Sequence, residues 1–118
     1  MNRQRVVGWL LTLSFALAIP GLASAAPDKK TERLWKSKCA SCHGADGKGD
    51  TDQGKEMGIG DVTTAAWQKQ FTDQQIKDVV AKGFKREKNG KQQEMKPLAD
   101  LTPEQVDALV GYVRSLKK

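Results

Sequence analysis

Both cysteines of the chain and its only histidine lie in residues 39–43 (Cys-Ala-Ser-Cys-His). Cys-x-x-Cys-His is the pattern that attaches a c-type haem, because the two thiols form thioether bonds to the porphyrin and the imidazole ligates the iron. Residues three and four apart share one face of a helix, so Cys39, Cys42 and His43 can all meet one side of a flat macrocycle. The motif therefore predicts one covalently bound haem, with His43 as an iron ligand.

Three other kinds of site also use two neighbouring cysteines. A thiol–disulfide redox site has the same spacing, but it sits in a βαβ pattern that this sequence lacks. A disulfide closing so small a loop would constrain the unfolded chain little. A zinc site needs four ligands, and Cys39, Cys42 and His43 supply three, so a carboxylate would have to complete it. We therefore favour haem, and we keep a haem-free thiol oxidoreductase, which would be colourless, as an alternative.

Two methionines are candidates for a second ligand on the haem iron. A thioether opposite histidine is a soft ligand that favours ferrous iron and raises the reduction potential. Met95 follows the predicted helices, so the chain has room to wrap round the haem and return on its other face. Reach does not exclude Met57, because the 14 residues from His43 to Met57 can extend about 46 Å at ~3.3 Å each. We expect Met95 to be the ligand, with Met57 or an open position as alternatives.

The first 25 residues have the pattern of a secretory signal peptide. Arg3 and Arg5 precede an apolar stretch at 6–19, and residues 23–25 (Ala-Ser-Ala) offer a cleavage site. The apolar stretch is short for a membrane span, which needs about 20 residues. We expect a periplasmic protein without stable membrane insertion after cleavage. Its mature part, residues 26–118, would be one domain of 93 residues, with the net charge reduced from +6 to +4.

Apolar residues at helical spacing predict an all-α fold. The predicted helical segments are 28–42, a short one at 63–70, one that begins after Thr72 and ends at Gly83, and 102–116. Two polar stretches, 44–60 and 85–100, are predicted to be loops. Trp67 and Phe71 are predicted to form part of the haem-pocket wall.

The sequence resembles the small soluble class I cytochromes c of bacteria over essentially all of the mature chain. The resemblance rests on the 39–43 motif with its trailing residues 44–50, Trp35 four residues before the first cysteine, Met95 and Pro97, and residues 109–112 (Leu-Val-Gly-Tyr). It implies the all-α cytochrome c fold, with three main helices and a short one around the haem, and the first and last helices in close contact. It also implies axial ligation by His43 and Met95.

Two positions depart from the pattern of this family. Many members have a glycine eight residues before the first cysteine, where the terminal helices cross, and this chain has Thr31 there. We therefore expect Gly111 to permit the close approach. Many members also use a proline carbonyl to accept the proton of the haem-ligating histidine, but no proline lies between positions 27 and 97. A carbonyl of residues 54–63 is expected to accept it from His43.

The resemblance implies an electron carrier rather than an enzyme, in which one electron passes between redox partner proteins while both axial ligands stay bound. The positive charge and the many lysines favour transient partners with acidic docking faces. Basic residues are mixed with acidic ones, which disfavours nucleic-acid binding, and we expect a monomer. The alternative is a haem-based sensor or small-ligand binder with a displaceable sixth ligand. A peroxidase is disfavoured because His43 is the only histidine and no distal acid–base group is evident.

Overall fold

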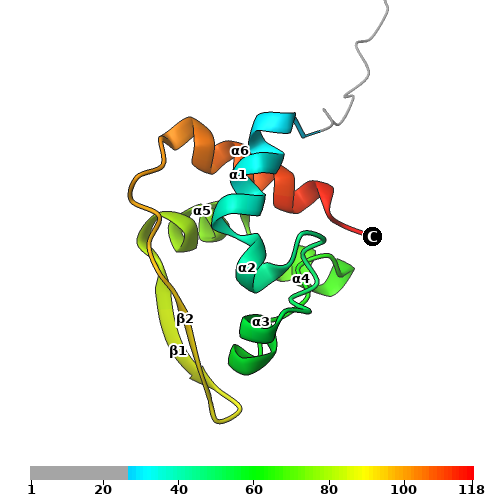
Figure 1. Ribbon diagram of the computed structural model, residues 1–118, viewed down its shortest axis with the longest axis vertical. Coiled ribbons are helices and arrows are strands. Elements are labelled where there is room, and N and C mark those ends of the chain that lie inside the picture. The colour runs from blue at the N-terminus through cyan, green and yellow to red at the C-terminus, as the bar shows by residue number, and fades with distance from the viewer. Residues whose placement is uncertain (1–26) are drawn as a thin grey trace, which may run out of the picture.

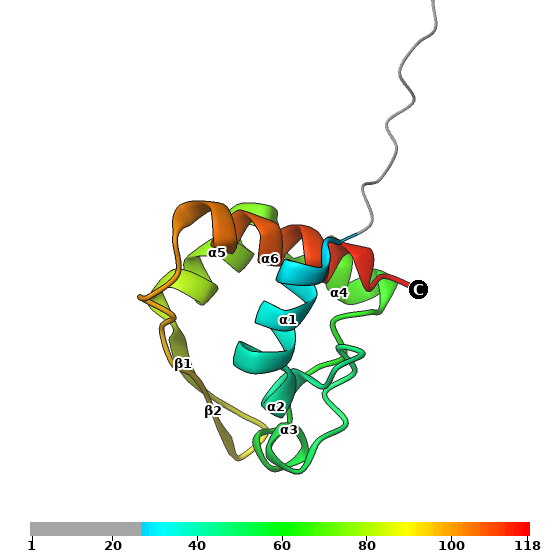
Figure 2. The same ribbon diagram turned by 45° about the horizontal axis from the view of Figure 1, so that its top comes forward.

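In the computed structural model, which describes residues 27–118, helices and one β-hairpin are arranged as a ring (Figures 1 and 2). Side chains from this ring line a cavity. The long helices are α1 (Lys29–Lys38), α5 (Asp73–Lys82) and α6 (Pro103–Ser115), and the short ones are α2 (Ala40–His43), α3 (Asp52–Met57) and α4 (Ala65–Gln70). Three main helices were expected, and this part of the prediction is confirmed. The signal peptide expected at 1–25 lies outside the described residues, and none of the helices described is both long and apolar enough to cross a membrane.

Side-chain caps define where the long helices begin. Asp28 caps α1, and its carboxylate accepts a hydrogen bond of 2.6 Å from the backbone N–H of Thr31. Helices α5 and α6 each begin with a capping box, built on Thr72 and Thr102, and Pro103 occupies the start of α6. These local signals place the helices along the chain, and α1, α5 and α6 then pack through their apolar stripes.

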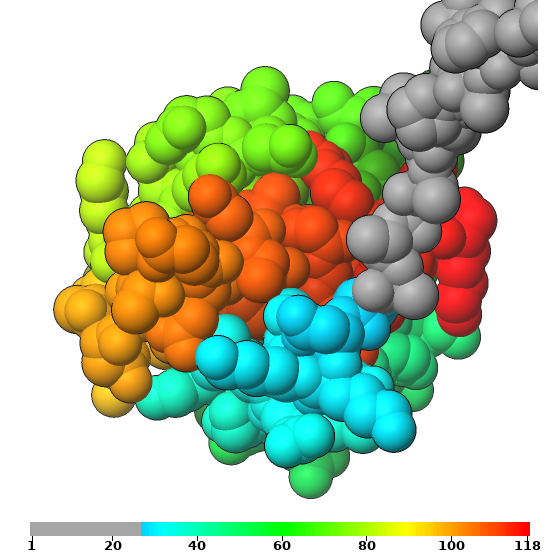
Figure 3. All heavy atoms as spheres, turned by 90° about the horizontal axis from the view of Figure 1, so that it is seen from above, coloured from blue at the N-terminus to red at the C-terminus, as the bar shows by residue number. Residues whose placement is uncertain are grey.

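Helices α1 and α6 cross in the centre of the core, where α6 lies between α1 and α5 (Figure 3). Trp35 of α1 is 3% exposed, and its ring centroid lies 5.2 Å from that of Tyr112 on α6. Thr31 is also buried, at 7% exposure. Gly111, in contrast, is exposed, and a Cβ there would meet nothing within 4 Å. The expectation that Gly111 permits the crossing is wrong, because it lies off the buried stripe of α6 that contains Leu109 and Tyr112.

A β-hairpin occupies most of the stretch that was predicted to be the loop 85–100. Strands β1 (Phe84–Lys88) and β2 (Lys91–Met95) pair antiparallel, with Phe84 opposite Met95. Asn89 and Gly90 form the turn, and both have positive φ, 53° and 74°. Asn-Gly is the preferred sequence for such a two-residue turn, because its twist matches that of paired strands. The loop prediction is wrong because this turn signal was not recognised.

Helix α3 lies inside the stretch 44–60, which was also predicted to be a loop. Thr51 caps its start, accepting a bond of 2.9 Å from the N–H of Gly54, and Gly58 ends it in the left-handed conformation. A Cβ on Gly54 would lie only 2.6 Å from the carbonyl oxygen of Cys42. Glycine at this position therefore lets α3 pack directly against α2.

Arg114 joins α6 to α4 and α5. Its guanidinium donates to the carbonyl oxygens of Gln68 (2.8 Å) and Phe71 (2.6 Å) and to the carboxylate of Asp73 (2.8 Å). The buried side chain of Gln68 donates in return to the carbonyl of Val113, at 2.9 Å. These bonds hold α6 against residues 68–73, the end of α4 and the start of α5.

Candidate functional site

The helices and the hairpin enclose a cavity of about 730 Å³, within the range of roughly 300–1,000 Å³ that is usual for ligand and cofactor sites. Most of the cavity lining is apolar, and its residues come from the helices, from both strands of the hairpin and from the segments between them. The main apolar residues of its wall are Trp35, Val62, Trp67, Phe71, Ile76, Val80, Phe84, Leu98, Leu109 and Val113. The prediction that Trp67 and Phe71 form part of the wall is confirmed. This cavity can hold a large, mostly apolar group.

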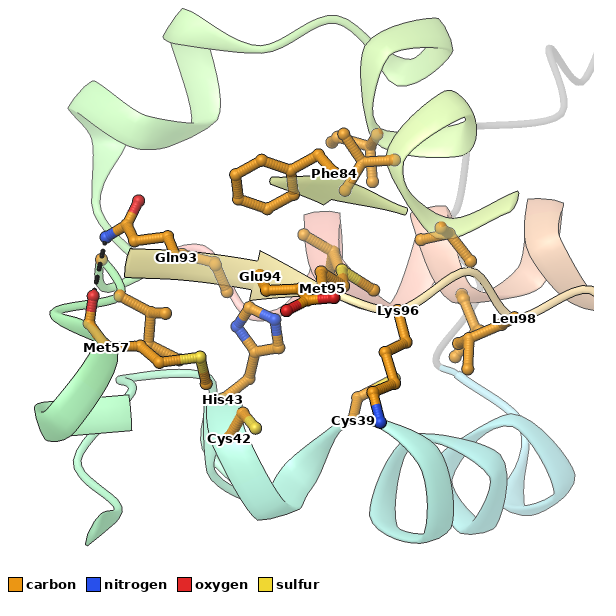
Figure 4. Close-up of a pocket in the computed structure, with 18 of the residues that line it drawn as sticks. Cys39, Cys42, His43, Met57, Phe84, Gln93, Glu94, Met95, Lys96 and Leu98 are labelled. Carbon is orange, nitrogen blue, oxygen red and sulfur yellow. Dashed lines mark hydrogen bonds between the residues drawn. The ribbon is translucent and has the colours of Figure 1, made fainter. Parts of the chain in front are cut away.

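The motif residues line this cavity together. Cys39 joins α1 to α2, and Cys42 and His43 lie on α2, so one turn of helix carries all three (Figure 4). Cys39 is 7% exposed, and Cys42 is half-buried. Neither cysteine is in a disulfide. One wall of the cavity thus provides two thiols and an imidazole at the spacing that a c-type haem requires.

Trp35 supports the end of this wall. Its indole N–H donates a buried bond of 3.0 Å to the carbonyl of Gly44, the residue directly after the motif. Its ring centroid lies 5.9 Å from that of His43. Gly44 has a φ of 81°, which turns the chain away from the cavity as glycine permits. The core of the protein therefore fixes the position of the histidine.

His43 Nδ1 has no hydrogen-bond partner, and within residues 27–118 it is the only buried side-chain nitrogen or oxygen without one. The expectation that a carbonyl of 54–63 accepts its proton is therefore wrong. Several carbonyls of that segment accept from other donors. The carbonyl of Gly54 accepts from the N–H of Ile59, and those of Met57 and Gly58 accept from the side chain of Gln93 on the hairpin. Burial lowers the pKa of His43. The imidazole is thus kept neutral, as an iron ligand must be.

The environment of the cysteines disfavours thiol–disulfide chemistry. Burial raises the pKa of Cys39 to about 11, so its sulfur is a thiol at neutral pH. A catalytic cysteine of an oxidoreductase requires an accessible thiolate. The sheet described here is a single antiparallel hairpin rather than part of a βαβ unit. Within residues 27–118, no group of three His, Cys, Asp or Glu side chains could hold a metal ion.

Both candidate methionines also line the cavity. Met57 ends α3 and lies to the left of His43 in the view of Figure 4, whereas Met95 ends β2 and lies above it. Both methionines are half-buried. The backbone at Met95 is packed tightly, because a Cβ on Gly83 would lie 2.4 Å from the Met95 carbonyl oxygen. After it, the N–H of Leu98 donates to the carbonyl of Val80 at 3.0 Å. The chain is thus closely held on both sides of the Met95 thioether.

Gln93 is a residue of this site that sequence reasoning missed. Only 3% of it is exposed, and its amide nitrogen donates to the carbonyls of Met57 (3.1 Å) and Gly58 (2.7 Å). Its amide oxygen accepts a bond of 2.7 Å from Arg86 Nε. Residues two apart on a strand point to the same face, so recognising the hairpin would have placed Gln93 beside Met95.

These residues fit a covalently bound haem. The cavity is large and mostly apolar, the two free cysteines and the histidine share one wall, and the buried imidazole is neutral. Cys39 and Cys42 would hold the porphyrin, and His43 would ligate the iron.

Comparison with known proteins agrees with this site. A family model described as "Cytochrome c" matches residues 29–117. The chain is similar to a solved structure titled "KustC0563 c-type cytochrome", with 35% sequence identity and a TM-score of 0.61. The match covers 75% of this chain and 98% of that one. No curated protein matches the sequence.

Proposed function

This chain belongs to the cytochrome c family, and from this we propose that it is an exported one-electron carrier with His43 and Met95 as axial ligands of its haem iron. The family carries a covalently bound haem c and transfers electrons, and Cys39 and Cys42 fit its attachment motif. When bound, the haem supplies a reversible one-electron change between ferric and ferrous iron. The observation that carries the proposal is the single cavity that holds the motif on one wall and a methionine thioether from the hairpin.

The chain supports this chemistry mainly by holding the site rigid and dry. The mostly apolar lining of the cavity disfavours water there, and Trp35 fixes the turn that follows His43. A low-dielectric site with two fixed ligands favours a high reduction potential and small structural change between redox states. Two protein ligands would also leave no open position for oxygen.

Met95 is a better candidate for the second ligand than Met57, because its backbone is held in place. It pairs with Phe84 across the hairpin and packs against Gly83. A ligand whose backbone is already ordered loses less conformational entropy when it binds. The carbonyl of Met57 is also held, by the bond from Gln93, but Met57 lies at the end of a six-residue helix and next to Gly58, where the chain turns.

The sequence of residues 1–25 supports export to the periplasm, where the redox partners would be met. Lys96 lines the cavity and is exposed, and further exposed lysines on the hairpin are Lys85, Lys88 and Lys91. With the formal charge of +4 on 26–118, they favour a transient complex with a partner that has an acidic docking face. We propose that the protein works as a monomer and binds no nucleic acid.

The visible spectrum of the exported protein tests this proposal. The chain would be produced in a bacterium able to attach c-type haem, and Met95→Ala and Met57→Ala would be compared with it. We expect a low-spin ferric spectrum with a weak long-wavelength sulfur-to-iron band that is lost in Met95→Ala and retained in Met57→Ala. The mass of the protein from the periplasmic fraction would report cleavage after Ala25.

Each part of the proposal can fail separately in this experiment. Loss of the band only in Met57→Ala would assign the ligand to Met57. A high-spin spectrum that neither substitution changes would favour a haem protein that binds small ligands. A colourless protein would contradict the central claim, and an uncleaved chain would contradict the proposed signal peptide.

A further inference from the structure

We propose that Gln93 is a positioning residue: by bonding β2 to the end of α3 it holds Met95 at the haem iron, and so limits replacement of the Met95 thioether by another ligand. This inference rests on the proposed ligation by Met95. Gln93 itself would not touch the iron.

The hairpin needs such an attachment. A two-stranded ribbon is at best marginally stable by itself in water. Among the residues of β1 and β2, Gln93 is the only one that is buried, and the others are exposed or half-buried. At its base the hairpin is held by the close packing of Gly83 against Met95. Along its length, the hairpin packs against α3 through β2.

Gln93 uses both polar atoms of its side-chain amide at this contact. An amide side chain offers two N–H groups and one carbonyl oxygen. The N–H groups of Gln93 meet the carbonyls of Met57 and Gly58, at 3.1 and 2.7 Å, and its oxygen accepts from Arg86 at 2.7 Å. Arg86 in turn lies over the ring of Phe84, 5.3 Å from its centroid. The amide thus connects both strands of the hairpin to α3.

Gln93 lies close enough to Met95, the proposed sixth ligand, for its bonds to α3 to affect the position of Met95. Gln93 precedes Met95 by two residues on β2, so both side chains face the cavity, about 7 Å apart along the strand (Figure 4). Lys91 makes a second bond to α3, 2.7 Å to the carbonyl of Lys55, but it is exposed to water. The bonds from Gln93 are part-buried, and a bond that is shielded from water resists competition from it better than an exposed one. Without Gln93, β2 could move away from α3 and take Met95 with it.

Imidazole titration of the ferric holoprotein tests this role, because imidazole binds the iron only when the thioether has left. Gln93→Leu removes all three bonds and places an apolar side chain of similar size at the buried position. Gln92→Leu is the matched control, since Gln92 is the exposed neighbour on the same strand. We expect imidazole to bind Gln93→Leu about tenfold more tightly than the parent, and Gln92→Leu within about twofold of it.

A second variant separates positioning from folding. Gln93→Glu keeps the acceptor for Arg86 but has no N–H groups for the two carbonyls of α3. We expect it to bind imidazole several-fold more tightly than the parent as well. Parent affinity in Gln93→Glu, or equal affinities in Gln93→Leu and Gln92→Leu, would overturn the inference. A fall in melting temperature without a change in affinity would also overturn it, since it would show a role in stability alone.

Met95→Ala in the same series distinguishes the two proposals. If it leaves the ferric spectrum unchanged, the assignment of the ligand is wrong and the role of Gln93 is rejected with it. If it removes the sulfur-to-iron band while Gln93→Leu has the affinity of Gln92→Leu, only the role of Gln93 is rejected.

Discussion

Trp35 connects the haem-attachment motif to the core of the protein. It packs against Tyr112, its ring is close to that of His43, and its N–H satisfies the buried carbonyl of Gly44. Leaving a buried carbonyl without a donor costs about 1–3 kcal/mol. One side chain therefore supports both the contact between α1 and α6 and the geometry of the site.

Asp61 gives a pH dependence at the scale of a single residue. The hydroxyl of Thr63 donates to this carboxylate and lowers the pKa of Asp61 below its usual value of 3.8, and the Thr63 N–H also bonds to it, at 2.8 Å. A lowered pKa means that the stabilisation is complete above the unfolded-state pKa and is lost as pH falls through the folded-state pKa. We expect Asp61→Asn to melt at a lower temperature than the parent near neutral pH, with the difference shrinking below about pH 4.

Melting curves over a series of pH values would measure this effect. Glu56→Gln, which removes an exposed carboxylate from α3, is the control for the change in net charge. A difference between Asp61→Asn and the parent that stays constant from neutral to acid pH would contradict the prediction.

The motif residues were predictable because their chemistry is local in the sequence. Cys39, Cys42 and His43 lie within five positions, so their placement needs only one turn of helix. Contacts between distant residues could not be derived this way. The role expected for Gly111 was wrong because its helical face was not known, and the unpartnered Nδ1 of His43 depends on where the carbonyls of another segment point.

At the scale of elements, the long helices were predictable and the small ones were not. Capping boxes and apolar stripes define α5 and α6 without reference to the rest of the chain. Helix α3 is only six residues long and contains Gly54, a residue that helix propensity disfavours. Its glycine is explained by the carbonyl of Cys42 packed against it, a contact that exists only in the folded protein.

Gly83 lies between α5 and β1, and its substitution is expected to disturb the haem site. It has a φ of 69° and a ψ of −179°, a conformation that is essentially restricted to glycine. A Cβ there would lie 2.4 Å from the carbonyl of Met95 and 2.7 Å from the nitrogen of Pro97. We expect Gly83→Ala to lower the melting temperature strongly and to weaken or remove the sulfur-to-iron band, because β2 must move.

Gly90→Ala is the matched control for this prediction. It also has positive φ, 74°, but a Cβ there would meet nothing within 4 Å. Its cost is the backbone strain alone, about 1–2 kcal/mol, and its spectrum should equal that of the parent. If Gly83→Ala and Gly90→Ala changed the spectrum to the same extent, crowding at Gly83 would not be the cause.

At the scale of the whole molecule, charge should govern the encounter with partners. The reduction rate of a small, negatively charged electron acceptor should fall several-fold as ionic strength rises from low to physiological values, because screening weakens attraction to a positive protein. Lys96→Gln, at the cavity, should slow this reaction more than Lys117→Gln, which removes the same charge from the C-terminal end. A rate that rises with ionic strength, or equal effects of the two variants, would contradict the proposed encounter surface.

The burial of Cys39 has a consequence for the order of events during the making of the protein. In the folded protein this residue is 7% exposed and lines the cavity, so an assembly factor has little access to its thiol to form a thioether bond. We therefore expect the bond to form while the chain is still open. Because the motif precedes α3, α4, α5, the hairpin and α6 in the chain, the haem would be attached first and the later elements would close around it. The haem would then act as a template on which the remaining residues assemble.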